Sequence, residues 1–366
     1  MSESPDYLTR QLITCLGNKR ALLGPIDAAV ATVKERLGTD RLRILDGFSG
    51  SGVVSRLFKQ HASSLVVNDL EAYARVVSEC YLRNASTVDS EAVHAAVTSL
   101  NHAVEHDLGE LGLIARLYAP RDDANIEAGE RAFYTRDNAR RLDRYRTLIE
   151  DCSLVPNELL LAPLLAQASV HANTSGVFKG FYKDAATGRG KFGGSGAASL
   201  ARIRGAITLA APVLSRHECD YEIFQTDTNQ LIDKVGGFDL AYFDPPYNEH
   251  PYGSNYFMLN LLVDYVEPTA ISRVSGIPLD WQRSRYNLAR TAWGELTALI
   301  EGVDARFVLL SFNDEGFVSP AALQEFLRGL GTVDTIDLRY NTFRGGRNLK
   351  QRSAHVTEHL FLLEKQ

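Results

Sequence analysis

Short apolar runs alternate with amphipathic segments along much of the chain. The runs are rich in β-branched and aromatic residues, and helical patterns separate most of them, which is typical of buried strands joined by helices. Seven runs are predicted strands: residues 41–48, 64–69, 221–226, 238–243, 306–312, 333–340 and 356–363. No helical pattern separates the last two, which favours an antiparallel pair at the edge of an otherwise parallel sheet. The pattern predicts an α/β fold with a seven-stranded, mostly parallel sheet.

The strand pattern stops between about residues 85 and 200, where helical periodicity dominates. Two apolar stripes have helical spacing: Val93, Val97, Leu100 and Val104, and Leu142, Tyr145 and Ile149. The stretch ends in GVFKGFYKDAATGRGKFGG, residues 176–194, where aromatic and basic residues surround a glycine-rich turn and predict a β-hairpin. We interpret residues 86–197 as a mainly helical insertion that divides one domain into residues 1–85 and 198–366.

The composition is that of a soluble globular protein. Hydrophobic residues make up 45% and charged residues 23% of the 366 residues, which argues against a disordered chain. No signal peptide and no apolar run of membrane-spanning length is recognisable, so we expect a cytoplasmic protein without membrane contacts. The four cysteines, Cys15, Cys80, Cys152 and Cys219, are widely spaced and predict reduced thiols and no metal site.

The charged residues argue against a uniformly basic surface. The net charge is −6, so any contact with nucleic acid must be local. Two local basic clusters occur: Lys179, Lys183, Arg189 and Lys191, and Arg339, Arg344, Arg347, Lys350 and Arg352. From its sequence alone, each cluster is either a solvated face or a surface that contacts phosphate groups.

A glycine-rich turn follows the first predicted strand. The segment Asp46–Gly52, DGFSGSG, precedes a helical pattern, and a turn of this kind lets a nucleotide-like cofactor approach the backbone closely. Asp69 ends the next strand, where a carboxylate can accept both ribose hydroxyls. Asp227 ends a later strand and can accept from an adenine amino group. Because the carboxyl ends of parallel strands form one crevice, these residues predict a single cofactor site.

The carboxylate of Asp46 distinguishes between cofactors. An acid at the start of the turn would repel a pyrophosphate, and the turn lacks the G-x-G-x-x-G spacing of dinucleotide-binding proteins. The same acid favours the positive sulfonium and amino groups of S-adenosylmethionine. The turn therefore predicts S-adenosylmethionine rather than a nicotinamide cofactor.

A rigid acidic turn ends the strand at 238–243. Two successive prolines in Asp244-Pro245-Pro246-Tyr247 remove two backbone donors and fix two φ angles, so the strand must end there. The Asp244 carboxylate and the Pro245 carbonyl can then accept both hydrogens of an exocyclic amino group and direct its lone pair towards a methyl donor. Tyr247 can stack on the base that carries the amine.

The Asp-Pro-Pro-Tyr sequence resembles the signature of the amino-group DNA methyltransferases. The segment CLGNKRALL, residues 15–23, precedes the glycine-rich turn and is similar to the N-terminal cofactor motif of the alpha group, the Dam-like adenine-N6 enzymes. The order of motifs also matches that group: N-terminal motif, glycine-rich turn, target-recognition insertion and catalytic motif. The resemblance implies a Rossmann-like methyltransferase fold in which the insertion recognises the target.

The resemblance also implies roles for individual residues. The implied contacts to S-adenosylmethionine come from Asn18, Lys19, Asp46, Phe48, Gly50, Gly52, Asp69 and Asp227, with Lys19 on the cofactor carboxylate. The implied contacts to a flipped adenine come from Asp244, Pro245, Pro246 and Tyr247. Residues 178–192, which include Lys179, Lys183, Arg189 and Lys191, match the recognition hairpin. The loop 342–352, with Arg344, Arg347 and Lys350, would contact DNA phosphates.

These features predict a monomeric adenine-N6 methyltransferase that acts on double-stranded DNA, functionally linked to a restriction endonuclease. Four alternatives stay open: cytosine-N4 in DNA, an RNA base, a protein glutamine, or an inert DNA-binding module with the same fold. Aspartate at position 244 and the motif order favour adenine. Two further segments are ambiguous: Asn313 and Asp314 either line the pocket or cap a helix, and Arg283 and Arg285 lie either in a solvated loop or on DNA phosphates.

Overall fold

The seven predicted strands form one sheet. The computed structural model describes residues 3–10, 13, 17, 19–194, 197–341 and 355–366. The strands are β1 (Leu42–Asp46), β2 (Ala62–Asp69), β3 (Asp220–Gln225), β4 (Phe238–Phe243), β5 (Ala305–Asn313), β6 (Gly331–Asn341) and β7 (His355–Lys365). Their order is β3-β2-β1-β4-β5-β7-β6. β7 runs antiparallel to both of its neighbours, β5 and β6, and all other neighbouring strands are parallel. The prediction of a mostly parallel sheet that ends in an antiparallel pair is confirmed.

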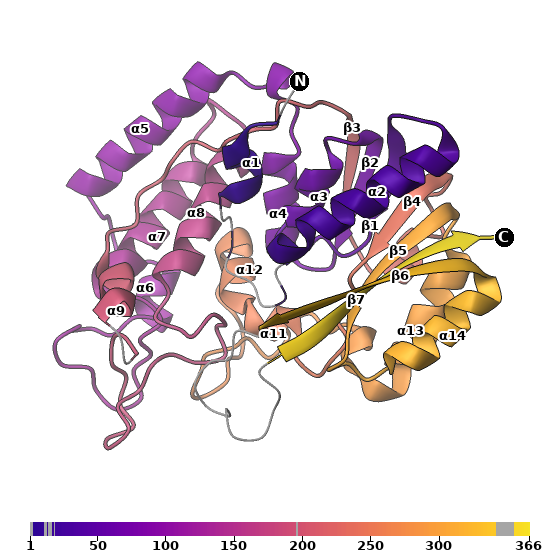
Figure 1. Ribbon diagram of the computed structural model, residues 1–366. Coiled ribbons are helices and arrows are strands. Elements are labelled where there is room, and N and C mark those ends of the chain that lie inside the picture. Colours follow the sequence, from indigo (N-terminus) through magenta and orange to yellow (C-terminus); the bar gives the residue numbers. More distant parts are fainter. Residues whose placement is uncertain (1–2, 11–12, 14–16, 18, 195–196, 342–354) are drawn as a thin grey trace.

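Helices cover both faces of the sheet (Figure 1). One face packs against α2 (Leu23–Leu37) and α3 (Val53–Phe58), and the other packs against α10 (Thr228–Leu231), α13 (Ala289–Gly302) and α14 (Pro320–Leu330). Successive strand residues point to opposite faces, so Ile44 of β1 joins the first core and Leu45 joins the second. This arrangement explains why the inner strands β1, β4 and β5 are mostly apolar: both of their faces are largely buried, whereas the edge strands β3 and β6 have half-buried and exposed residues.

A third core lies in the helical part beside the sheet (Figure 1). Its helices are α4 (Ala72–Tyr81), α5 (Ser90–His106), α6 (Leu113–Leu117), α7 (Arg136–Glu150), α8 (Glu158–His171) and α12 (Phe257–Asp264). The two apolar stripes predicted on α5 and α7 are buried in it, as expected. Because α4 and α12 flank β2 and β4 in the chain, this core also joins the helical part to the sheet. The division into residues 1–85, 86–197 and 198–366 stays a prediction.

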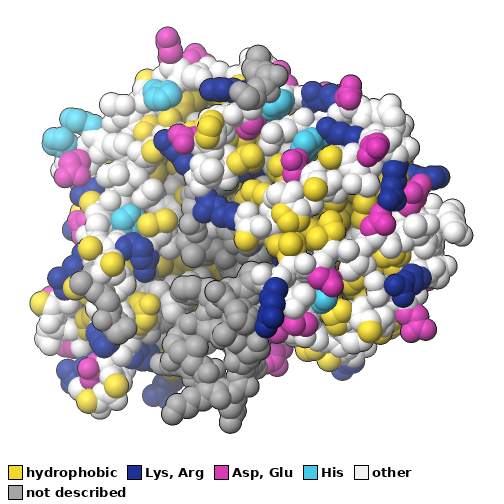
Figure 2. Space-filling model, viewed as in Figure 1, with side chains coloured by type: hydrophobic (Ala, Val, Ile, Leu, Met, Phe, Trp, Pro, Cys, Tyr) yellow, Lys and Arg dark blue, Asp and Glu magenta, His cyan; other side chains and the backbone are white. Residues whose placement is uncertain are grey.

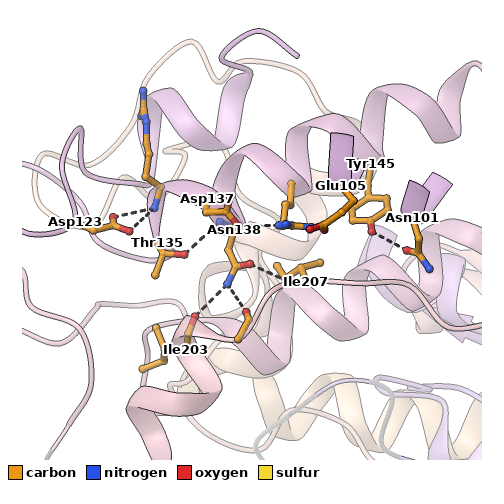
Figure 3. Close-up of polar contacts among 12 residues, drawn as sticks. Asn101, Glu105, Asp123, Thr135, Asp137, Asn138, Tyr145, Ile203 and Ile207 are labelled. Atoms are coloured by element: carbon orange, nitrogen blue, oxygen red, sulfur yellow. Dashed lines mark hydrogen bonds and ion pairs between the residues drawn. The ribbon is translucent and has the colours of Figure 1, made fainter. Parts of the chain in front are cut away.

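Two asparagines, the buried Asn138 and the half-buried Asn101, hold the chain where it returns from the helical part to β3; Figure 3 shows the contacts of Asn138. Asn138 of α7 donates to the carbonyls of Ile203 (3.1 Å) and Gly205 (2.8 Å) and accepts from the Ile207 amide (3.0 Å). Asn101 of α5 donates to the Leu209 carbonyl at 3.0 Å and accepts from its amide at 2.9 Å. Residues 206–209 form neither helix nor strand, and Ile207 and Leu209 therefore obtain backbone hydrogen bonds from side chains instead of from a strand.

The remaining elements are short. They are α1 (Pro5–Thr9), η1 (Lys19–Leu22), η2 (Ala85–Thr87), α9 (Ala197–Arg204), α11 (Tyr252–Asn255) and η3 (Arg285–Asn287). No described helix is long and apolar enough to cross a membrane. Cys80, Cys152 and Cys219 are free thiols, and within the described part of the chain no cluster of ligating side chains suits a metal ion. Cys15 lies outside the described residues.

Candidate active site

One cleft lies at the carboxyl ends of the parallel strands, where β1 and β4 are neighbours and the strand order reverses. It holds about 940 Å³ of empty space, part of it open to solvent. The predicted site residues that line it are Lys19, Phe48, Gly50, Asp69, Asp227, Asp244 and Pro246. The glycine-rich turn and the Asp-Pro-Pro-Tyr segment therefore share one cleft.

The glycine-rich turn is shaped for close approach. Gly50 and Gly52 have φ of 52° and 73°, in the left-handed region that favours glycine. The Asp69 carboxylate closes the turn from β2, because its Oδ2 accepts from the Gly50 amide at 2.7 Å and its Oδ1 from the Glu71 amide at 2.9 Å. Asp69 thus faces the cleft while holding the backbone that forms the cleft floor.

Asp46 lies beneath the turn and is fully buried. Its Oδ2 accepts from the Ser55 hydroxyl, the Phe48 amide donates to its carboxylate, and its Oδ1 has no hydrogen-bond partner among the described residues. Burial raises the pKa of Asp46 to about 7. Neither Asp46 nor Gly52 belongs to the cleft lining. Their predicted contact with the cofactor stays a prediction, and their observed role is to support the turn.

Asp227 and two aromatic rings form the end of the cleft near β3. Asp227 caps α10, where it accepts from the Asn229 amide at 3.0 Å. The buried Tyr286 donates its hydroxyl to Asn229 Oδ1 at 2.7 Å, and its ring meets Phe48 edge to face at 5.3 Å. Tyr286 was not predicted from the sequence, since it follows no strand and lies in a segment that reads as a polar loop.

Asp244 is part of a row of three charged side chains, with Lys19 between Asp244 and Glu358. Lys19 Nζ lies 3.0 Å from Asp244 Oδ1 and 2.8 Å from Glu358 Oε1, and only 4% of Lys19 is exposed. Burial opposes the charge of Lys19, but the two carboxylates raise its pKa well above the usual value. Burial raises the pKa of Asp244 to about 6, with Lys19 lowering it and Glu358 raising it. At neutral pH Asp244 is an ionised acceptor at the cleft wall.

The aromatic residue of the turn packs beside this row. Tyr247 meets Phe312 with a centroid distance of 5.6 Å, and Lys19 Nζ lies 5.9 Å from the Tyr247 ring centroid. The side chains of Pro245 and Tyr247 are not part of the cleft lining, whereas that of Pro246 is. The contact of Lys19 with a cofactor carboxylate and the stacking of Tyr247 on a base stay predictions.

Two further cleft residues were not found from the sequence. Burial, and then the charge of Asp69, raise the pKa of Glu71 to about 8, and its Oε2 accepts from Asn260 Nδ2 at 2.6 Å. Tyr252 of α11 lines the same cleft and stacks on Tyr256 with a centroid distance of 5.9 Å. A signal for Glu71 existed, because a second acid stands two residues after Asp69, but its burial could not be inferred from a single sequence.

Residues 176–194, which we call the recognition segment, form a reduced hairpin. One antiparallel bridge joins Lys183 and Gly190, and the Asp184 side chain accepts from the Thr187 amide at 2.9 Å within the turn. The buried Asn173 precedes the segment and holds its C-terminal end against the helical part: its Nδ2 donates to the carbonyls of Ala132 (2.7 Å) and Lys191 (2.8 Å), and its Oδ1 accepts from the Gly193 amide (3.0 Å). The predicted hairpin is present as one bridge and a capped turn.

The predicted basic residues of the recognition segment are all exposed: Lys179, Lys183, Arg189 and Lys191. On the face shown in Figure 2, the described Lys and Arg side chains are interspersed with Asp and Glu, as the net charge of −6 suggests. Asn18, Arg344, Arg347 and Lys350 lie outside the described residues.

The structure shows the surroundings of the four residues whose roles the sequence left open: Asn313, Asp314, Arg283 and Arg285. Asn313 accepts from the Glu315 amide at 3.0 Å and Asp314 from the Thr357 amide at 3.3 Å, and neither lines the cleft. They stabilise the turn after β5. In the segment 280–287 the exposed Arg283 stacks on Trp281 and Arg285 pairs with Glu295, while Gln282, Ser284, Tyr286 and Asn287 line the cleft.

Comparison with known proteins gives consistent similarities. A family model described as D12 class N6 adenine-specific DNA methyltransferase matches residues 16–275. The type II methyltransferase M.NlaIII of Neisseria lactamica is 26% identical over 358 residues, which cover 96% of this chain and 98% of that protein. M.CviAII of Paramecium bursaria Chlorella virus 1 is 26% identical, covering 90% and 93%. M.FokI of Planomicrobium okeanokoites is 25% identical and extends further, since the match covers 96% of this chain but 52% of M.FokI.

Proposed function

The chain belongs to the D12 class N6 adenine-specific DNA methyltransferase family, and from this premise we propose that it transfers the methyl group of S-adenosylmethionine to adenine N6 at specific sites in duplex DNA. The observation that carries the proposal is the shared cleft. The glycine-rich turn, with Gly50 and Asp69, and the catalytic turn, with Asp244 and Pro246, line the same space. A methyl donor and an amino group bound at these two turns would face each other.

The cleft residues fit S-adenosylmethionine. Asp69 and Asp227 offer carboxylates to hydroxyl and amino groups, and Phe48 offers an apolar face to the adenine ring. Ser49 lines the cleft, and its buried Oγ has no hydrogen-bond partner among the described residues, so it is available to a ligand. S-adenosylmethionine supplies an electrophilic methyl group on a sulfonium. We assign the cofactor contacts to Asn18, Lys19, Asp46, Phe48, Gly50, Gly52, Asp69 and Asp227.

The catalytic turn orients the amino group. The Asp244 carboxylate and the Pro245 carbonyl accept the two N6 hydrogens, so the nitrogen lone pair leaves conjugation with the ring and points towards the methyl group. Pro246 keeps the turn rigid, and Tyr247 stacks on the adenine, which must leave the duplex to reach the cleft. A proton leaves N6 after the new C–N bond forms, and the ionised Asp244 is placed to accept it. No covalent bond to the protein is needed.

The recognition segment is proposed to read the DNA. Its exposed cations suit phosphate groups, and its turn is small enough to approach a groove. We place target recognition in residues 86–197 and further phosphate contacts in Arg344, Arg347 and Lys350. Because relatives are type II methyltransferases, including M.NlaIII, we propose that the chain is the modification enzyme of a restriction-modification system.

The test is a substrate competition. The chain is incubated with methyl-labelled S-adenosylmethionine and a mixture of duplex DNA, RNA and protein, and the labelled products are separated. We expect label in N6-methyladenine of duplex DNA only, and detection of modified bases in the DNA of expressing cells should return one recurrent sequence context. Label in cytosine, in RNA or in protein would refute the proposed substrate, and label in none of them would refute the proposed activity.

A further inference from the structure

Glu358 is a buried acid behind the catalytic turn. It lies on β7, is fully buried, and accepts at Oε1 from the Ser311 hydroxyl at 2.6 Å. The same Oε1 is 2.8 Å from Lys19 Nζ. It lies outside residues 16–275, the part of the chain that the family model matches. An isolated carboxylate at such a place would be very unfavourable, so its charge requires the Lys19 ammonium.

Lys19 joins Glu358 to the reaction site. Its ammonium lies between two carboxylates, with Asp244 Oδ1 at 3.0 Å on the cleft side, where 18% of the Asp244 side chain is exposed. The order from the protein interior to the cleft is therefore Ser311, Glu358, Lys19 and Asp244. Two acids and one base leave one net negative charge on the three ionised groups, and Asp244 is the one that faces the cleft.

We propose that Glu358 is a positioning residue: it shares the Lys19 ammonium with Asp244 and so sets the direction and acceptor strength of the Asp244 carboxylate. With Glu358 in place, the Lys19 ammonium divides its positive charge between Glu358 and Asp244 Oδ1, and Asp244 Oδ2 remains available to the target amine. Without the Glu358 carboxylate, the Lys19 ammonium interacts with Asp244 alone, which makes the Asp244 carboxylate a weaker hydrogen-bond acceptor. The role in methyl transfer rests on the proposed function, whereas the charge sharing does not.

Several other groups act on Asp244. Tyr242 of β4, Tyr252 of α11 and Asp46 of β1 lie close enough to Asp244 for its negative charge to raise their pKa values. Burial keeps the pKa values of Tyr242 and Tyr252 well above the usual value, so both hydroxyls stay neutral. Lys19 and Glu358 are the ionised groups that act most strongly on Asp244 after burial itself, and their effects are opposite in sign. Replacing Lys19 and replacing Glu358 should therefore shift the Asp244 titration in opposite directions.

The test combines Glu358→Gln with Lys19→Met. In cofactor-free protein, carboxyl-carbon NMR of Asp244 should show titration at lower pH in Glu358→Gln and at higher pH in Lys19→Met. In single-turnover methylation at neutral pH, Glu358→Gln should be about 10- to 100-fold slower. This is the range observed in metal enzymes when a residue that orients a ligating side chain is replaced, and Glu358 would orient Asp244 in a comparable way. The acid limb of its pH–rate profile should move to lower pH, while affinity for S-adenosylmethionine stays within a few-fold.

The matched control is Glu364→Gln. Glu364 is also on β7 but pairs with Arg36 and Arg306 at the surface, so its replacement should leave both the titration and the rate unchanged. If Lys19→Met does not fold because Glu358 loses the Lys19 ammonium, the double variant removes both charges and is compared with Glu358→Gln. An Asp244 titration that is unchanged in Glu358→Gln overturns the proposal. Failure of the wild-type chain to methylate DNA, with the titration shift present, overturns the proposed function and not the charge sharing.

Discussion

The catalytic turn and the recognition segment are held in different ways. Behind Asp244, Lys19 of η1 and Glu358 of β7 are buried, and the Lys19 ammonium lies within 3.0 Å of both carboxylates. The recognition segment has exposed cations and one antiparallel bridge; the buried side chain of the preceding Asn173 holds its C-terminal end, and Phe178 packs in the helical core. The proposed reaction geometry is therefore set by the interior of the fold, whereas the segment that we propose to read the target is a loop with a held base and exposed cations.

The largest effect should come from the catalytic side. Asp244→Ala removes the acceptor that we propose directs the amine lone pair, so we expect single-turnover methylation to fall by at least about 10²–10³-fold. Affinity for S-adenosylmethionine, measured by calorimetry, should stay within a few-fold. Asp233→Ala is the control, because Asp233 is an exposed acid in the loop before β4. Near-normal methylation by Asp244→Ala would make the turn structural and remove the distinction between the two regions.

The pH dependence follows from the same residue. Burial raises the pKa of Asp244 to about 6, so the carboxylate is ionised above that pH and gains a proton as the pH falls through it. Protonated Asp244 is a weaker acceptor, so single-turnover methylation should be high above about pH 6 and decrease below it. A rate that stays constant down to pH 4, in protein that is still folded by circular dichroism, would contradict this assignment.

The cofactor side should give the next largest effect. Asp69→Ala removes an acceptor for the ribose hydroxyls and also frees the Gly50 amide. We expect S-adenosylmethionine to bind more weakly by about 1.5–3 kcal/mol, the range for hydrogen bonds to a charged group. Glu222→Ala, an exposed acid on the neighbouring β3, should leave the affinity unchanged. Unchanged affinity in Asp69→Ala would remove Asp69 from the cofactor site.

Sequence reasoning succeeded where the signal was local. The inner strands are short runs that are largely buried, whereas the edge strands β3 and β6 contain half-buried and exposed residues and were recognised from their β-branched and aromatic residues. The two turns that line the cleft follow β1 and β4. Glu358 could not be found in this way, because its partner Lys19 is at the other end of the chain and β7 inserts between β5 and β6. Tyr286 and Tyr252 were missed for the same reason: tertiary packing, and no local pattern, brings them to the cleft.

The recognition segment marks the limit of sequence reasoning. Glycine and aromatic residues predicted its turn, but little of it pairs as strands, so the length of the ladder was not predictable from propensity. Its anchor, Asn173, is the first of three successive polar residues after α8, Asn173, Thr174 and Ser175, and no sequence pattern distinguishes it from the other two. Which of its side chains would contact bases depends on the DNA, and the sequence contains no signal for that.

Asn173→Ala tests whether the base of the segment matters. The substitution leaves the Ala132 and Lys191 carbonyls and the Gly193 amide without their partner, which should cost about 1–3 kcal/mol in local stability. We expect faster hydrogen exchange in residues 176–194 and weaker discrimination between target and non-target DNA, with unchanged affinity for S-adenosylmethionine. The control is Asn157→Ala, because Asn157 makes no side-chain capping bond to α8. Equal exchange in both variants would show that Asn173 does not hold the segment.

The smallest effect should come from the exposed cations at the tip of the recognition segment, because their replacement should change DNA affinity without changing the rate of methyl transfer. Replacing Lys179, Lys183 and Arg189 with glutamine should reduce the slope of log affinity against log salt by about 0.9 for each DNA phosphate that the protein no longer neutralises. The same reduction is expected for Arg344, Arg347 and Lys350. Lys234→Gln is the control, since exposed Lys234 lies near the amino end of β4, opposite the cleft.

If the cations bind phosphate alone, the preferred DNA site should persist in the variants, because phosphates carry no sequence information. An unaltered slope would identify these cations as a solvated face, and DNA binding would then have to be sought elsewhere on the helical part.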